Sequence, residues 1–420
     1  MHESLRTTFR SLQIRNYRLY FFGQLVSLSG TWAQTVAQAW LVLRLSHNNA
    51  EAVGLVTAMQ YVPVLLFGAW AGLVADRVDK RHLLVGTQTA MALTATGLAV
   101  VTFTGTATIW NVCVLALLTG AANAIDMPAR QAMVNEMVGA GEVVNAVGLN
   151  SAVFNASRVT GPALAGAILV TLGTGWCFAL NAISFVAVIA ALLAMRTEEM
   201  RPAQRVPRAR GQIREGFRYI LATPTLLSNL VVVAVVSALA LNYPVVLPTL
   251  AKVTFHGDAG TYSIMSAAMG FGALAGALVV ASRHRPTDRF MALGGVAFGA
   301  GACLAAVAPS LTVLVVLLVL VGAFSIVFLS TSNTLLQLEA IPEMRGRVLA
   351  VRAITVVGSA PIGAPIFGLL VQHSGARWGL AAGGLATLGA TTWYVGYLRR
   401  RNLLGPSVTT PEAAAFADPY

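Results

Sequence analysis

The stretch Gly68–His82 reads GAWAGLVADRVDKRH and places five charged residues within six positions, directly after a long apolar run. A second apolar run follows at once, over about residues 83–103. Each run is long enough to cross a bilayer as a helix, which takes about 20 residues. The charged residues therefore read as a short loop between two membrane helices.

The composition of the whole chain agrees with a membrane protein. Of its 420 residues 56% are apolar and only 10% are charged, and the mean hydropathy is +0.72. Soluble domains average roughly 45–50% apolar and about 25% charged residues. The apolar residues form blocks of spanning length and not the alternating ten-residue segments of an outer-membrane barrel. An all-α integral membrane protein is predicted.

Twelve apolar blocks fall into two sets of six. Four regions follow: a six-helix bundle over residues 1–195, a basic connector over 196–225, a second six-helix bundle over 226–400 and a disordered cytoplasmic tail over 401–420. The expected helices lie at about 19–45, 53–75, 83–103, 109–125, 143–172 and 176–195, then 226–250, 262–281, 290–308, 311–335, 348–371 and 378–398.

The basic residues predict the orientation. If the N-terminus is inside, 23 of the 28 lysines and arginines fall in cytoplasmic segments, the side on which basic residues are retained. Both termini are therefore expected in the cytoplasm, and the arginine-rich composition suggests a bacterial cytoplasmic membrane. The net charge of +12 is spread over short loops that face anionic lipid, so no nucleic-acid partner is needed.

The pattern Gly72-x-x-x-Asp76-Arg77-x-x-Lys80-Arg81 resembles the signature loop between the second and third helices of the major facilitator superfamily of secondary transporters. An ordinary cytoplasmic loop would explain Lys80 and Arg81, but it needs neither an acid beside an arginine nor a glycine one turn earlier. The resemblance implies two pseudo-repeated six-helix bundles that rock about a central substrate path.

The resemblance also implies partners for this loop. In the family its basic residues contact an acid at the end of the fourth helix, which here pairs Arg77 or Arg81 with Asp126. The loop acid faces the start of the eleventh helix, which sets Asp76 against the region of Gly346. An anion at a helix N-terminus contributes about 0.3–1 kcal/mol at a surface, enough to bias a two-state gate.

The two halves also share a spacing. Glu136 precedes Pro162 by 26 residues, and Glu339 precedes Pro365 by the same number. Halves of this superfamily are parallel repeats about an axis normal to the membrane. The spacing therefore supports a chain built from two copies of one bundle.

The fifth predicted helix carries Gly148, Gly161-Pro162 and Gly166. This string is similar to the pattern of the antiporter branches of the superfamily, with two glycines replaced by other small residues. Small residues let a partner helix approach closely, and Pro162 removes a backbone hydrogen bond and permits a bend. The resemblance implies export, although an ordinary packing face would have the same composition.

Arg158 lies about mid-membrane in this helix, where an arginine costs about 2.5–3.5 kcal/mol on insertion scales. It must face a partner or a hydrated cavity. There its fixed positive charge could respond to a transported proton or bind an acidic group of a substrate. Arg352 lies within about two turns of a helix end and is expected to snorkel. The arginine that the family often carries in the fourth helix is replaced by Ala116.

The candidates for the cavity and for ion coupling are few. Gln34 and Gln38 are one turn apart on the first helix, so they either line one cavity or pack through their amides. Asp126 and Glu339 lie at inner helix ends, and Asp126 is the preferred candidate for the residue that carries the coupling proton. The first helix is also similar to the exporter branch for drugs, macrolides and siderophores.

These observations predict a secondary active transporter that exports a bulky amphipathic small molecule, by alternating access and in exchange for protons. A passive facilitator, or a permease subunit served by a separate ATPase chain, is the alternative. The only lysines, Lys80 and Lys252, stand in no phosphate-binding motif. We expect a monomer in the bilayer, with no enzyme activity, cofactor or metal.

Overall fold

A computed structural model describes residues 9–139, 141–200, 212–283 and 287–401, without the side chains of residues 69, 73, 75, 76 and 212–214. Every regular element in these ranges is helical. The first part holds α2 (Arg15–Leu45), α3 (Ala50–Arg77), α4 (Lys80–Phe103), α5 (Ile109–Val138), α6 (Val143–Thr171) and α7 (Thr174–Leu193). The second holds α8 (Gln212–Ala222), α9 (Pro224–Ala240), α10 (Tyr243–Thr249), a π-helical turn η3 (Leu250–Thr254), α11 (Ala259–Ala281), α12 (Asp288–Ala306), α13 (Leu311–Glu339), α14 (Arg345–Gly358), α15 (Ala360–Ser374) and α16 (Ala376–Arg400). Two 3₁₀ turns, η1 (Arg10–Gln13) and η2 (Thr197–Glu199), precede α2 and follow α7.

Ten segments of the described chain are long and apolar enough to cross a membrane. They include α3 to α7 and α11 to α13, together with two composite spans over Pro224–Thr254 and Arg345–Ser374. Helices α2 and α16 have the length, at 31 and 25 residues, but are more polar. The prediction of an all-helical integral membrane protein is confirmed.

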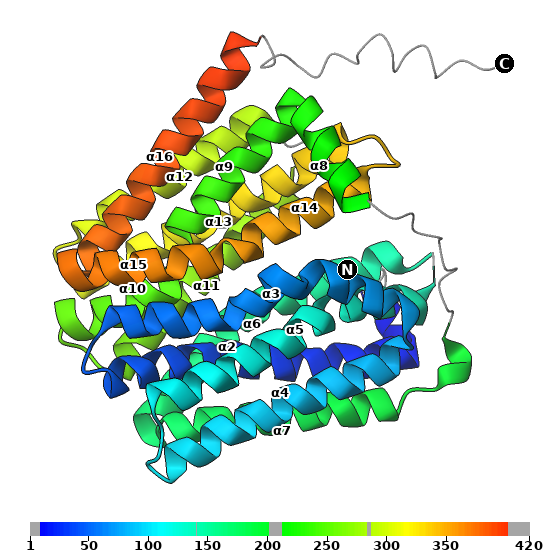
Figure 1. The fold of residues 1–420 in the computed structure, drawn as a ribbon, viewed down its shortest axis with the longest axis horizontal. Helices are drawn as coiled ribbons and strands as arrows, with labels where there is room; N and C mark the ends of the chain where they lie inside the picture. The colour runs from blue at the N-terminus through cyan, green and yellow to red at the C-terminus, as the bar shows by residue number, and fades with distance from the viewer. Residues whose placement is uncertain (1–8, 140, 201–211, 284–286, 402–420) are drawn as a thin grey trace.

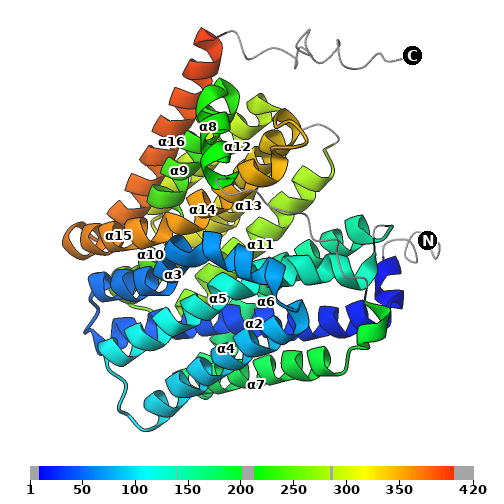
Figure 2. The ribbon, with the colours of Figure 1, turned by 45° about the vertical axis from the view of Figure 1, so that its right-hand side comes forward.

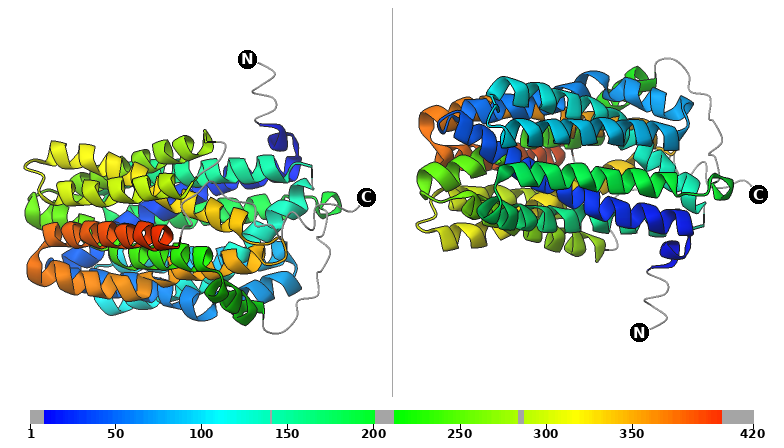
Figure 3. Two further views of the ribbon diagram at one scale, coloured as in Figure 1. Left: turned by 90° about the horizontal axis from the view of Figure 1, so that it is seen from above. Right: turned by 90° about the horizontal axis from the view of Figure 1, so that it is seen from below.

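The helices gather in two groups, with α2 to α7 in the lower part of Figure 1 and α9 to α16 in the upper part. The two views of Figure 3 show that the long helices share one general direction. The contacts repeat from one group to the other. Helix α3 packs on α5 as α11 packs on α13, α4 on α7 as α12 on α16, and α4 on α5 as α12 on α13.

The two groups meet along α6 with α11 and along α3 with α15. At one end of the molecule, where α2 passes into α3, they touch directly. The backbone N–H of Ala50 donates to Oε1 of Gln372 at 2.8 Å, and a Cβ on Gly54 would lie 2.5 Å from the carbonyl oxygen of Ala364. We call this the closed end.

At the opposite end the groups diverge, as Figure 2 shows. This end carries the Asp76 loop and the start of α6. Val144 of α6 is 86% exposed, and no atom lies within 4 Å of where a Cβ would stand on Gly72 or Gly148. We call this the open end.

Side-chain caps define where several helices begin. Asn49 accepts from the backbone N–H groups of Glu51 and Ala52 at the start of α3. Thr108 and Asp258 form capping boxes at the starts of α5 and α11. Each cap satisfies backbone donors that would otherwise lack a partner in the first helical turn.

The predicted end of the fourth span near residue 125 is wrong, because α5 continues to Val138. Asp126 was expected at the inner end of this helix, but both Asp126 and Pro128 lie inside it. The added turns bury Met133 and Met137 against Tyr17, Tyr20 and Leu84. This packing holds the extension in helical form.

Two predicted single helices are broken. The span at 226–250 divides into α9 and α10 at Leu241 and Asn242, just before Pro244. Proline lacks the N–H that would continue the ladder, and Nδ2 of Asn242 donates to the carbonyl of Ala238 at 2.7 Å. The span at 348–371 is interrupted only at Ser359, two residues before Pro361, and Ser359 itself keeps helical dihedral angles.

The expected connector contains the amphipathic helix α8, which the sequence analysis did not foresee. It packs on α14, where Glu215 pairs with Arg347 at 3.0 Å and Ile220 is buried. Residues 201–211 of the connector and 402–420 of the tail lie outside the described residues.

Candidate functional site

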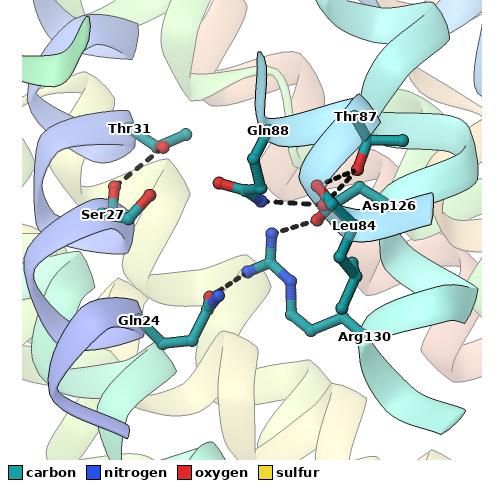
Figure 4. Close-up of polar contacts among 8 residues, drawn as sticks. All are labelled: Gln24, Ser27, Thr31, Leu84, Thr87, Gln88, Asp126 and Arg130. Carbon is teal, nitrogen blue, oxygen red and sulfur yellow. Dashed lines mark hydrogen bonds and ion pairs between the residues drawn. The ribbon is translucent and has the colours of Figure 1, made fainter. Parts of the chain in front are cut away.

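A buried polar cluster lies inside the first group of helices (Figure 4). Asp126 of α5 is fully buried and accepts hydrogen bonds from Oγ1 of Thr87 at 2.9 Å and Nε2 of Gln88 at 2.8 Å, both on α4. Arg130, one turn later on α5, forms an ion pair with the same carboxylate. A buried carboxylate needs such partners, because an uncompensated one costs several kcal/mol.

The guanidinium of Arg130 also reaches α2, where Nη1 donates to Oε1 of Gln24 at 2.5 Å. The pair thus ties three helices together through one shared charge. The cluster is incompletely satisfied: within the described part of the chain, Nε of Arg130, Oε1 of Gln88 and the Tyr20 hydroxyl are buried without a hydrogen-bond partner. Unpaired buried polar atoms are uncommon and point to a functional site or to a second arrangement.

The expected pairing of Arg77 or Arg81 with Asp126 is not formed in this structure. Arg77 is exposed, and Arg81 donates to the carbonyls of Leu192 and Leu193 at 2.8 Å each. The reason lies in the length of α5, since its continuation past Asp126 brings an arginine from the same helix to the carboxylate.

The other members of the predicted gating loop are separated. Lys80 pairs with Glu136 at 3.2 Å, which ties the start of α4 to the end of α5. The side chain of Asp76 lies outside the described residues, so its expected approach to Gly346 is untested. Open space surrounds the Cβ positions of Gly72 and Gly346.

Asp79 caps α4 by accepting from the backbone N–H of His82 at 2.9 Å. Burial raises the pKa of Asp79, but the hydrogen bonds and the charge of His82 outweigh burial and lower it below the ordinary value. The loop is thus held by its own cap and not by the cluster around Asp126.

Helix α6 is tightly packed along one part and free along the other. A Cβ on Gly161 would lie 2.3 Å from Cβ of Trp32 on α2, and one on Gly166 would lie 2.9 Å from Cβ of Ser263 on α11. Gly148 meets nothing within 4 Å. Pro162 lies inside the helix without breaking it.

Arg158 lies on α6 at the start of the packed part. Its carbonyl oxygen is only 2.0 Å from the place a Cβ would take on Gly270 of α11. Its guanidinium lies over the ring of Trp32, with Cζ 5.5 Å from the ring centroid. Among the described residues it makes no ion pair and no hydrogen bond.

The two glutamines of α2 behave differently. Oε1 of Gln34 accepts from Nδ2 of Asn181 on α7 at 2.8 Å, so this side chain serves packing. Nε2 of Gln38 donates to Gln60 at 3.2 Å, and both line a small cavity of about 20 Å³ with Pro244 of the second group. Room for about one water shows that the closed end is sealed here.

Glu339 and Arg352 lie in the second group. Oε2 of Glu339, at the end of α13, is buried without a hydrogen-bond partner. Arg352 donates from Nη2 to the carbonyl of Leu329 at 2.8 Å and is partly exposed, so its guanidinium has a partner within its own half.

A surface hollow of about 700 Å³ lies elsewhere, between α3, α5 and α15 outside the closed end. Its lining is largely apolar and includes Leu55, Trp110 and Pro365. Size alone therefore does not mark the site, because the titratable and unpaired groups described above lie between and within the helix groups.

The sequence analysis missed several members of these sites. Gln24, Gln88 and Trp32 are brought to their partners by long-range packing that no local pattern reveals. Arg130 carried a signal that could have been used, since it follows Asp126 by four residues and an ion pair at that spacing is favourable on a helix.

The arrangement suits a molecule that changes shape around small solutes. One end is sealed and the other is open, a buried acid is shared among three helices, and Arg158 has neither an ion pair nor a hydrogen bond among the described residues. Among the described residues no group of three or more histidine, cysteine or acidic side chains could hold a metal ion.

Comparisons with known proteins bear on this arrangement. The sequence model of a family described as transmembrane secretion effector matches residues 6–402. The staphyloferrin A transporter of Staphylococcus aureus is 26% identical, over 85% of this chain and 91% of that protein. The multidrug efflux pump Tap of Mycolicibacterium fortuitum is 28% identical, over 85% and 89%. The macrolide efflux protein A of Streptococcus pyogenes is 24% identical, over 88% and 94%.

Solved structures show the same fold. A bacterial homologue of the human lysosomal transporter Spinster, inward-facing and unoccupied, superposes with a TM-score of 0.74 at 14% identity, over 94% of this chain and 99% of that one. A D-xylose–proton symporter gives 0.74 at 12% identity, over 91% and 97%.

Proposed function

The chain belongs to the transmembrane secretion effector family, whose members are transporters of the major facilitator superfamily and not enzymes, and on that premise we propose that it is a secondary active exporter. The cargo is a bulky amphipathic small molecule. One observation carries the proposal: the helix groups are sealed at one end and separated at the other, around an unpaired arginine.

Twelve spans in two bundles are the architecture that fits this role. Helices α2 and α16 complete the ten apolar segments, and the repeated helix contacts support two copies of one bundle over residues 1–195 and 226–400. Residues 196–225 then act as the connector and 401–420 as a disordered tail. The protein works as a monomer with no cofactor.

The open end is the cytoplasmic end in this proposal. It carries the basic Asp76 loop, and an excess of lysine and arginine marks cytoplasmic loops. The structure then corresponds to an inward-facing state in a bacterial cytoplasmic membrane, with both termini inside. When the gate formed by the Asp76 loop closes, α6 with Gly148 and α3 with Gly72 approach the second bundle.

The proton is the coupling ion, and Asp126 is its carrier. Protonation would remove the negative charge that holds Arg130, and the guanidinium already bridges to Gln24 on α2. The unsatisfied atoms of Gln88 and Tyr20 offer alternative partners in the second state. Glu339 is the other candidate, since one of its oxygens is buried and unbonded.

The substrate class follows from the relatives and from the space available. The relatives are named for a siderophore, for macrolides and for multiple drugs. Phe154 of α6 is 46% exposed and packs edge-to-face against Trp32, with the ring centroids 6.1 Å apart. Aromatic surface of this kind suits bulky amphipathic solutes.

Purified protein in liposomes tests the function. With an imposed proton gradient and no nucleotide, the exporter should move a macrolide, a siderophore or a dye against its concentration gradient, and an uncoupler should stop it. Movement that persists undiminished with the uncoupler would indicate a passive facilitator. Movement that requires ATP and a second chain would indicate a permease subunit.

A further inference from the structure

The unpaired guanidinium of Arg158 is the most unusual charge in the described part of the molecule. Two other arginines within the helices have partners, since Arg130 pairs with Asp126 and Arg352 donates to the carbonyl of Leu329. Arg158 has only the face of Trp32. A cation–π contact leaves the N–H donors of the guanidinium edge free.

Those donors are reachable. Arg158 is partly exposed as a residue, whereas Nε of Arg130 and of Arg352 are buried without a partner among the described residues. Because Arg158 is partly exposed and its guanidinium makes no hydrogen bond to another described residue, its N–H donors remain available to a ligand.

Two contacts bring the surroundings of Arg158 near the second helix group. Trp40, about two turns beyond Trp32 on α2, stacks on Tyr262 of α11 with the ring centroids 6.3 Å apart. The backbone of Arg158 itself touches Gly270 of α11. The guanidinium thus lies where the two groups begin to separate.

The neighbours of Arg158 add an aromatic surface and no competing acid. Phe154, one turn before it on α6, packs edge-on against Trp32. Ser29 and Thr160 hydrogen-bond to each other at 2.8 Å and line the α2–α6 contact. The only fixed charge described at this position is positive.

We propose that Arg158 and Trp32 form a binding subsite for the carboxylate, or a similar planar oxyanion, of an amphipathic substrate with an aromatic or other flat apolar body. This inference rests on the proposed function and assigns its substrate class: anionic amphipaths are preferred over neutral and cationic ones. The forked N–H donors bind the oxyanion in a bidentate manner. The rings of Trp32 and Phe154 contact the apolar body.

Three probes with one ring system test the preference: 1-pyrenebutyrate, 1-pyrenebutanol and 1-pyrenebutylamine. Their affinities are measured by pyrene fluorescence anisotropy on the full-length protein in nanodiscs of zwitterionic lipid, without any gradient. The parent protein should bind the carboxylate at least about tenfold more tightly than the alcohol, and the amine most weakly.

The variants separate charge from shape. Arg158→Ala should remove the advantage of the carboxylate while changing the affinity for the alcohol by less than about twofold, and Arg158→Lys should recover only part of it. If the alanine variant fails to fold, Arg158→Gln provides a second uncharged substitution at this position. Arg352→Ala, the matched control in the other half, should keep the full preference.

Equal affinity of the parent for the three probes, no binding of the carboxylate, or an unchanged preference in Arg158→Ala would overturn the inference. The assay needs no transport, so its outcome is distinguishable from that of the proposed function. A protein that prefers the carboxylate but exports nothing under a proton gradient has the subsite without the function. A protein that exports but binds the probes equally has the function without the subsite.

Discussion

The two ends of the molecule are built from the same helices but packed in opposite ways. At the closed end, the backbones of α3 and α15 approach so closely that a Cβ on Gly54 would lie 2.5 Å from the carbonyl oxygen of Ala364. At the open end, Gly72 of the same helix α3 faces empty space. The contrast shows that Gly72 at the open end makes no close helix–helix contact in this conformation.

Helix α6 makes the same contrast within a single element. Gly161 and Gly166 are in contact with α2 and α11, while Gly148 touches nothing. A helix with small residues along its whole length but close contacts on only part of it is suited to two packings. The free glycines are then the contact surface of the other state, in which the open end closes.

Replacing glycine by leucine at the two ends should give the largest and most different effects. Gly54→Leu places a side chain 2.5 Å from the carbonyl oxygen of Ala364 at the closed end, so it should abolish transport and lower the melting temperature; overpacking costs about 1–3 kcal/mol. Gly148→Leu should also stop transport but leave the melting temperature at the parent value. Thermal unfolding and export by the same samples provide the measurement.

Normal transport by Gly148→Leu would contradict the proposed second packing of α6, because closure of the open end would then not require a glycine at this position. Equal destabilisation by both variants would show that Gly148 is packed in the resting protein.

Asp126→Asn tests what couples the two ends. The change should eliminate proton-driven export while probe binding remains, because the side chain can no longer release and regain a proton. It also leaves Arg130 buried without its counter-charge, at a cost of up to about 3–5 kcal/mol. The double variant Asp126→Asn/Arg130→Gln should recover stability but not export. Export at the parent rate by either variant would show that Asp126 does not carry the coupling proton.

Asp76→Asn concerns the gate at the open end. We expect export to fall at least about tenfold, because the loop acid would no longer stabilise the closed form of this end through the start of α14. The melting temperature and the amount in the membrane should stay unchanged, since the Cβ positions of Gly72 and Gly346 face open space in this structure. Normal export by this variant would show that the loop has no gating role.

The smallest effects are expected from the helix caps, one at each end. Asp79→Ala at the open end and Asp258→Ala at the closed end should each cost about 1 kcal/mol at neutral pH. The pKa of both acids is lowered in the folded state; for Asp258 the main cause is its hydrogen bond from the backbone of Thr261, and for Asp79 the bonds from His82 outweigh the opposing effect of burial.

A lowered folded pKa fixes the sign of the pH dependence. The stabilisation is fully present above the unfolded pKa of about 3.9 and is lost as the pH falls through the lower folded value. Melting curves across acidic pH should show this loss in the parent and not in the alanine variants. Asp258→Asn keeps a capping oxygen and should lose only the titration.

The sequence predicted most of the fold because hydrophobic length is a strong signal in membranes. Helices α4 and α6 end within a few residues of their expected positions. The misses have local causes. The apolar run stops at Asp126, but buried methionines continue the helix to Val138, and hydropathy alone does not show the break before Pro244.

The site was less predictable than the fold. The position of Arg158 in its helix was enough to expect a cavity or a partner, and the structure brings it to Trp32. The partners of Gln34 and Asp126 depended on how distant helices pack, and the family pattern suggested loop arginines where Arg130 stands. Helix α8 was missed because an eleven-residue amphipathic helix is too short for a hydropathy search.

The most direct test of alternating exposure is to measure distances at both ends in one protein. In a background with Cys113, Cys177 and Cys303 replaced, spin-label pairs at Val144 and Leu278 report on the open end, and pairs at Leu55 and Leu369 report on the closed end. Double electron–electron resonance on the protein in nanodiscs gives both distances. They are compared between the parent and the Asp126→Asn variant, and between neutral and lowered pH. The Val144–Leu278 distance should shorten as the Leu55–Leu369 distance lengthens; distances that do not change, or that change in the same direction, would contradict the account.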